Sequence, residues 1–99
     1  SKKTLVFSDE AYLEFLEPEE QRSAVELVRK GHNVMVSRTF SKVHGLAGLR
    51  FGYAIGQPDT IKKLSPYQMG PVINQAGLAA AKASLNDAAF AKLTRTKNN

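Results

Sequence analysis

Three short apolar runs divide the chain, and each has the length of a strand rather than of a helix. They cover about residues 4–8, 33–38 and 51–56. Runs of four to eight apolar residues, bounded by polar or turn-forming residues, are typical of buried strands. The pattern therefore predicts three strands at these positions.

A helical pattern separates the first two predicted strands. Pro18 stands where helices tolerate proline, and two glutamates follow it in the predicted first turn. Ala24, Leu27 and Val28 then form an apolar stripe at helical spacing, and Gly31 is a typical helix-ending residue. The sequence predicts a helix from Pro18 to the C-cap at Gly31. Strand, helix and strand in this order indicate a βαβ unit with parallel strands and a right-handed crossover.

The third predicted strand follows the second after a glycine-containing loop that is too short for a crossover helix. This strand is therefore expected to enter the sheet antiparallel. Further helical patterns begin at three places. The first begins at Pro58 and ends before Pro66, and the second runs from Val72 to about Ser84. The third follows Asp87, a typical N-cap residue, and continues through Phe90 and Leu93. The pattern predicts an α/β fold with two parallel strands, one antiparallel strand and flanking helices.

Composition narrows the class of protein without identifying it. The 99 residues, 42% of them hydrophobic and 23% charged, are typical of one small soluble domain or of part of a larger one. The absence of cysteine excludes disulfides and thiolate metal sites and allows a reducing compartment, so we expect a cytoplasmic protein. The two histidines are isolated, which predicts no metal site. The apolar runs are too short to span a membrane, and no targeting segment is visible.

The net charge of +5 does not indicate a nucleic-acid partner. Much of the excess lies near the chain ends, where charged side chains are usually solvated. Nucleic-acid-binding surfaces combine basic residues with aromatic residues on one face, and this pattern is absent from the sequence. These basic end residues are Lys2, Lys3, Lys92, Arg95 and Lys97.

Chemically versatile side chains follow both parallel strands. The first strand leads into Asp9 and Tyr12, and the second leads into a hydroxyl-rich segment that contains Lys42. The carboxyl ends of parallel strands share one edge of a sheet, so these groups are expected to converge there. Arg50, in the following loop, is available at the same edge.

This combination suits the cofactor pyridoxal phosphate. A lysine amine such as that of Lys42 forms a Schiff base with the aldehyde and later moves a proton. The pyridine nitrogen needs a carboxylate partner, for which Asp9 fits, and Tyr12 is placed to contact the ring oxygen. A phosphate group needs hydroxyls and a guanidinium, and nearby glycines let the chain approach it closely. The phosphate-binding candidates are Thr39, Ser41 and Arg50.

Two segments together resemble a known enzyme family. FSDEAYLEF and SRTFSKVHGLAGLRFGYAIG are similar to the fold-type I pyridoxal-phosphate-dependent aminotransferases of class I/II, particularly the histidinol-phosphate aminotransferases of amino-acid biosynthesis. The resemblance implies a homodimer that moves an amino group from an amino acid or amino-phosphate to a 2-oxo acid. It implies Lys42 as the Schiff-base lysine, Asp9 and Tyr12 as partners of the ring, and Thr39, Ser41 and Arg50 as phosphate ligands.

The resemblance covers only an internal part of such an enzyme. Residues 1–99 correspond to part of the cofactor-binding large domain, a three-layer α-β-α structure, without the N-terminal half and the C-terminal small domain. The isolated chain is therefore expected to be inactive. The segment 65–71 departs from the family pattern, because Gly70 stands where the family has a polar side chain. In the family this region lies near the cofactor of the dimer partner.

Other interpretations of these residues stay open on the sequence alone. The cofactor could serve decarboxylation of an amino-acid phosphate, or the chain could be a non-catalytic folding or interaction unit. The single residues also have structural alternatives: Lys42 at an ordinary surface, Asp9 as a turn cap, Tyr12 in the core, Thr39 or Ser41 bonded to local backbone, and Arg50 paired with Asp9 or Glu10. His44 is interpreted as a loop residue, and Gly45 and Gly48 either as conformational or as close-approach positions.

Overall fold

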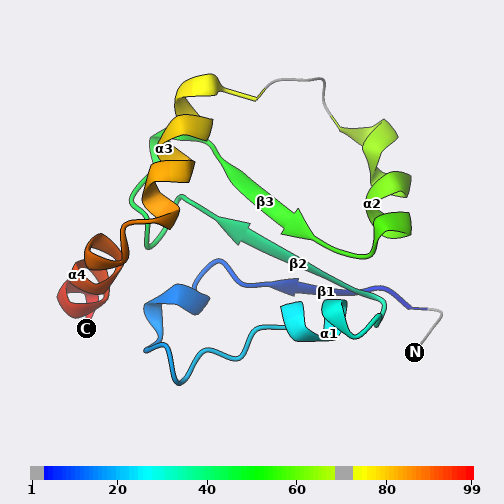
Figure 1. The fold of residues 1–99 in the computed structure, drawn as a ribbon, viewed down its shortest axis with the longest axis horizontal. Helices are drawn as coiled ribbons and strands as arrows, with labels where there is room; N and C mark the ends of the chain where they lie inside the picture. The colour runs from blue at the N-terminus through cyan, green and yellow to red at the C-terminus, as the bar shows by residue number, and fades with distance from the viewer. Residues whose placement is uncertain (1–3, 69–72) are drawn as a thin grey trace.

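The three predicted strands form one mixed sheet in the computed structural model, which describes residues 4–68 and 73–99 (Figure 1). The strands are β1 (Val6–Asp9), β2 (Val34–Thr39) and β3 (Gly52–Ile55), and their order in the sheet is β1-β2-β3. β1 pairs parallel with β2, whereas β3 pairs antiparallel with β2. The α/β class and both predicted strand directions are thereby confirmed.

The core lies around the central strand. Val34 and Val36 of β2 are buried, and Val28 packs against them from the helix α1 (Val25–Arg29). In contrast, Val6 and Phe7 of the edge strand β1 are more than half exposed. The apolar first half of β2 is covered on one face by α1, whereas its second half, from Ser37 to Thr39, is polar and leads to the edge of the sheet.

The predicted start of the first helix at Pro18 is wrong. Residues 18–20 form a turn, and α1 begins only at Val25. The physical reason is a carboxylate from outside the helix: Glu10 accepts hydrogen bonds from the Ala24 N–H at 2.7 Å and from Ser23 Oγ at 2.9 Å. These bonds satisfy the start of α1, where backbone N–H groups have no partner inside the helix.

The predicted end of this helix is confirmed. Gly31 directly follows the C-cap residue Lys30 and has a φ of +83°. This left-handed conformation is the one that glycine adopts without steric cost at a helix end. The N–H of Gly31 donates to the carbonyl of Val28 at 3.0 Å, which closes the last turn.

Three further helices follow the sheet. They are α2 (Pro58–Leu64), α3 (Gln75–Leu85) and α4 (Ala88–Asn98), with short 3₁₀ turns η1 (Leu13–Phe15), η2 (Ala47–Leu49) and η3 (Ser65–Tyr67) elsewhere. The predicted α2 is confirmed, although Pro66 lies within η3 directly after it rather than beyond a free end.

The caps of α3 and α4 decide where these helices begin. The predicted start of α3 at Val72 lies outside the described residues, and Ile73 and Asn74 are not helical. The Asn74 side chain accepts hydrogen bonds from the N–H groups of Ala76 and Gly77, which fixes the start at Gln75. Asp87 caps α4 as predicted, because its Oδ1 accepts from the Phe90 N–H at 3.0 Å.

The C-terminal helix is not a simple solvated end. Arg95 of α4 is half-buried, and its Nη1 donates to the backbone oxygen of Glu14 in η1 at 3.1 Å. The expectation of a solvated Arg95 is therefore wrong, because α4 folds back onto η1. Within residues 4–68 and 73–99, no helix has both the length and the apolar character needed to cross a membrane.

Candidate active site

A cleft of about 370 Å³ opens at the edge of the sheet where β1 and β2 end. It brings together four of the predicted site residues, two of them from strands and two from the loop that joins β2 to β3. These are Asp9, Thr39, Ser41 and Arg50, and the cleft is completed by Ala11, Ser37, Arg38, Phe51 and Gly52.

Asp9 is exposed at the end of β1 and held by two hydrogen bonds. Its Oδ1 accepts from the N–H of Ala11 at 3.1 Å and from Ser37 Oγ at 3.2 Å. The first bond is the turn cap that the sequence left open as an alternative, and the second bridges to β2. Both bonds fix the orientation of the carboxylate at the rim of the cleft without burying it.

Thr39 and Ser41 are linked through the backbone. The Thr39 Oγ1 accepts from the N–H of Ser41 at 3.0 Å, so Thr39 does satisfy local backbone. A hydroxyl that accepts one hydrogen bond can still donate its proton to a ligand. The turn also places both hydroxyl-bearing residues on the cleft wall.

Arg50 has a strained backbone. Its φ of +51° is the only positive φ of a non-glycine residue in the described parts of the chain. Its Nη1 donates to the carbonyl of Ala47 at 3.0 Å, which ties the guanidinium to η2. A left-handed conformation costs a non-glycine residue about 1–3 kcal/mol, and such residues cluster at functional sites.

Lys42 and Tyr12 are not among the residues that line this cleft; Lys42 is exposed, and its side chain lies against the Tyr12 ring. The backbone around it is anchored by Phe40 and Val43, which are almost completely buried. Its Nζ stands 5.1 Å from the centroid of the Tyr12 ring, close enough for a cation–π contact. Tyr12 is 64% exposed, so the alternative that it is a core residue is wrong.

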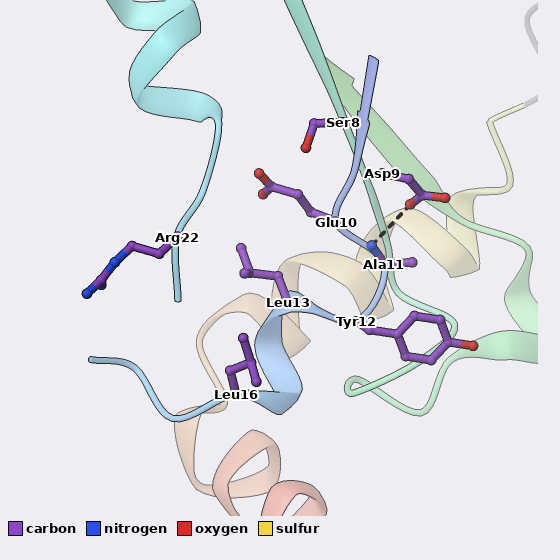
Figure 2. Close-up of a pocket in the computed structure, with 8 residues that line it drawn as sticks. All are labelled: Ser8, Asp9, Glu10, Ala11, Tyr12, Leu13, Leu16 and Arg22. Atoms are coloured by element: carbon purple, nitrogen blue, oxygen red, sulfur yellow. Dashed lines mark hydrogen bonds between the residues drawn. The ribbon is translucent and has the colours of Figure 1, made fainter. Parts of the chain in front are cut away.

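A second hollow, of about 500 Å³, adjoins the first one along the segment after β1 (Figure 2). Asp9 and Ala11 line both hollows. Figure 2 shows Asp9 and Tyr12 projecting to one side of this segment and Glu10 projecting to the other. Neighbouring side chains of an extended chain point to opposite sides. Asp9 therefore faces the cleft, whereas Glu10 points away from it toward the rest of the protein.

Glu10, which is buried, and Arg38, which is partly buried, form an ion pair that was not predicted from the sequence. Arg38 Nε and Nη2 lie 3.1 and 3.0 Å from Glu10 Oε2, and the side chains are 23% and 5% exposed. Burial alone would lower the pKa of Arg38, but hydrogen bonding to Glu10 and the nearby Tyr53 hydroxyl raise the pKa above its usual value. The predicted parallel pairing offered a signal for this contact. Asp9 lies opposite Ser37, so the residues that follow them, Glu10 and Arg38, are neighbours across the sheet.

The ion pairs also answer the alternative that Arg50 pairs with Asp9 or Glu10. The guanidinium that meets Glu10 is that of Arg38, so the suggested pairing of Arg50 with Glu10 is not found. Within the described part of the chain, Arg29 with Glu26 is the other ion pair between side chains, and it is exposed. No cluster of potential metal-binding side chains occurs among residues 4–68 and 73–99.

Known proteins resemble this chain in both sequence and fold. Residues 1–98 match the family model described as "Aminotransferase class I and II". The chain belongs to this aminotransferase family. It is 41% identical over 98 residues to a histidinol-phosphate aminotransferase from Legionella pneumophila (strain Lens), which covers 99% of the chain. It is also 49% identical over 92 residues, 93% of the chain, to an aromatic amino acid aminotransferase from Mycobacterium tuberculosis.

The fold of this chain matches part of a solved aminotransferase. A histidinol-phosphate aminotransferase from Sinorhizobium meliloti, in complex with pyridoxal-5'-phosphate, matches with a TM-score of 0.84 and 35% sequence identity. The match covers 98% of this chain and 26% of that one. The chain also spans only about a quarter of the length of the curated relatives, 27% for the Legionella enzyme and 26% for the mycobacterial one.

Proposed function

We propose that the chain is part of a pyridoxal-phosphate-dependent aminotransferase that moves an amino group from an amino acid or amino-phosphate to a 2-oxo acid. The observation that carries this proposal is the cleft where β1 and β2 end. There, Asp9, Thr39, Ser41 and Arg50 share one wall, and Lys42 directly follows Ser41 in the chain, with its amine over the Tyr12 ring. The family supports the same activity.

The phosphate end of the cofactor fits the cleft. Two hydroxyls and one guanidinium supply donors for phosphate oxygens, and a guanidinium can bind two of these oxygens at once. We propose that Thr39, Ser41 and Arg50 bind the phosphate and thereby fix one end of the cofactor.

The ring end is assigned to three other groups. When bound, pyridoxal phosphate serves as an electron sink for the bond broken at the donor's α-carbon. Lys42 Nζ would hold the cofactor at its aldehyde carbon, and the released amine would take up and return the donor's α-proton. The Asp9 carboxylate would keep a proton on the pyridine nitrogen, and the Tyr12 hydroxyl would hold the ring oxygen.

The chain is proposed to be an internal part of the large domain of that enzyme, which we propose acts as a cytoplasmic homodimer. Val6 and Phe7 on the edge strand are 52% and 58% exposed, and Leu85 on α3 is 59% exposed. Apolar surface of this kind in a sheet edge and in helices is usually covered in a complete domain. Because Lys42 and Tyr12 are exposed in the 99 residues, we infer that the isolated chain does not transaminate.

The amino donor is proposed to be histidinol phosphate or a related compound. The two kinds of relative differ in the donors that their names state, and the residues of this chain serve the cofactor in either case. An assay of the complete enzyme with histidinol phosphate and with phenylalanine, each with 2-oxoglutarate, separates these donors. Carbon dioxide release without oxo-acid exchange would instead identify a decarboxylase.

The role of Lys42 is tested by trapping the cofactor. Borohydride reduction of the complete enzyme, followed by proteolysis and mass spectrometry, should locate the cofactor on Lys42. Lys42→Ala should lose the trapped adduct and nearly all turnover, because one amine both binds the cofactor and moves the proton. Lys62→Ala, which removes an exposed lysine of α2, is the matched control and should retain both. A trapped adduct with near-normal turnover in Lys42→Ala would refute the assignment.

A further inference from the structure

The loop that carries Lys42 is fastened to the rest of the protein at several points. The N–H of Leu46 donates to the carbonyl of Phe40 at 2.9 Å, and the N–H of Gly45 donates to the carbonyl of Lys42 at 2.9 Å. The side chain of Val43 is completely buried between them. These contacts fix residues 40–46 as a compact turn, from which Lys42 points outward.

His44 connects this turn to a helix that is distant in the sequence. Its Nδ1 lies 2.7 Å from Ser84 Oγ near the end of α3, in a partly buried position. Its ring stands 5.2 Å from the Phe40 ring at an angle of 43°. Figure 1 shows α3 beside the loop that joins β2 to β3. His44 therefore connects two elements rather than lying free in a loop.

We propose that His44 and Ser84 form a positioning pair that holds the Lys42 turn against α3 and so directs the Lys42 amine. The inference rests on the proposed function of Lys42. Lysine has a long flexible stem, so the direction of its amine depends on how firmly its backbone is held. Positional errors of about 1 Å at a reacting group can cost about a hundredfold in rate.

Apolar contacts also hold this turn, but the hydrogen bond between His44 and Ser84 adds a directional restraint to them. A Cβ placed on Gly45 would lie 3.3 Å from the Phe90 ring, so α4 packs close to the turn. Gly45 itself has a φ of +68°, a left-handed conformation that favours glycine. Phe40 and Val43 restrain the turn from the core. Neither contact has the directionality of the bond to Ser84, which joins a side chain two residues after Lys42 to a fixed helix.

The test uses the complete enzyme with Ser84→Ala, His44→Phe and both changes together. His44→Phe keeps a ring against Phe40 and removes the nitrogen, whereas Ser84→Ala removes the hydroxyl alone. One lost hydrogen bond corresponds to about a three- to tenfold effect. We expect kcat to fall by about this factor with little change in the KM of the amino donor, and the double variant to resemble the single ones. His32→Gln, at the other, exposed histidine, is the matched control and should have no effect.

The readout that does not depend on turnover is hydrogen exchange. In Ser84→Ala, the amides of Gly45 and Leu46 should exchange about three- to tenfold faster, whereas those of β2 keep their rates. Unchanged exchange at both amides would overturn the pair itself. A uniform increase across β2 would also overturn it, because this would show a general loss of stability. Absence of trapped cofactor on Lys42 in the wild-type enzyme would overturn the link to catalysis, while the exchange comparison still decides whether the pair holds the turn.

Discussion

Arg38→Met should destabilise the fold strongly because it leaves a buried carboxylate without its cation. Methionine has a similar length and no charge, so the change removes the ion pair and keeps most of the apolar contact of the stem. Glu10 is 5% exposed at its side chain and would retain the bonds from Ser23 Oγ and the Ala24 N–H. The charge itself would stay buried.

The magnitude follows from this geometry. Removing one partner of a buried ion pair typically costs about 3–5 kcal/mol. The retained bonds to Glu10 and the 23% exposure of Arg38 place the expected loss near the lower end, about 3 kcal/mol. Because the pKa of Arg38 is raised, its guanidinium is fully charged at neutral pH, and this stabilisation is lost at the alkaline end only as the pH rises through the raised value. A measurement at neutral pH therefore records the full effect.

The assay is urea unfolding of the chain followed by circular dichroism, at two protein concentrations so that self-association is visible. The midpoint should fall by about 1–3 M for a loss of about 3 kcal/mol. Arg29→Met is the matched control: it breaks the pair with Glu26 on the surface of α1, where the side chains are 72% and 62% exposed. This control should cost about 0.5 kcal/mol or less.

The double variant with Glu10→Gln tests the reason for the effect. Once the carboxylate is neutral, part of the loss caused by Arg38→Met should be recovered, because the buried charge has been removed. The reasoning is refuted if Arg38→Met destabilises the chain no more than Arg29→Met. It is also refuted if the double variant is less stable than Arg38→Met alone.

Three further predictions concern the cleft and the sheet. Asp9→Asn should leave cofactor binding largely intact but lower kcat by more than about tenfold, a barrier increase of about 1.4 kcal/mol, because an amide does not stabilise a charged pyridine nitrogen. A smaller loss of kcat in steady-state assays would contradict the assignment. Arg50→Ala and Arg50→Gly should both weaken cofactor affinity, with activity recovered by excess cofactor, even though glycine relieves the backbone strain at this position; recovery in glycine alone would point to a conformational role. Gly52→Ala should cost about 1–3 kcal/mol in urea unfolding, because a Cβ there would lie 2.9 Å from the backbone oxygen of Arg38; Gly48→Ala, where the space is open, is its control and should cost clearly less.

The sheet could be predicted from the sequence because its signals are local. Short apolar runs indicate the three strands. The loop between β2 and β3 is too short for a crossover helix, which indicates that β3 runs antiparallel to β2. The grouping of Asp9 with Thr39 and Ser41 follows from strand direction alone. The individual roles of these residues, and of Lys42, Tyr12 and Arg50, stay predictions.

The features that could not be predicted depend on contacts between distant segments. The start of α1 is set by a carboxylate from the end of β1, whereas Pro18 and its two glutamates carry a local helix signal that tertiary contacts override. Likewise, Arg95 carries the composition of a solvated tail but bonds to the Glu14 carbonyl because α4 folds back. Propensity and charge pattern contain no information on either contact.

The order of the strands has a consequence for how the site forms during folding. β1, β2 and β3 lie side by side in the order in which they are synthesised, and the proposed cofactor residues all fall between Asp9 and Arg50. Pairings between strands that are neighbours in the sequence close shorter loops, and cost less chain entropy, than pairings with strands farther away in the sequence. The wall that holds Asp9, Thr39, Ser41 and Arg50 is therefore expected to assemble early, as one cooperative unit, before more distant parts of an enzyme dock onto it. Pulse-labelled hydrogen exchange during refolding would show this as early protection of the β1–β2 amides.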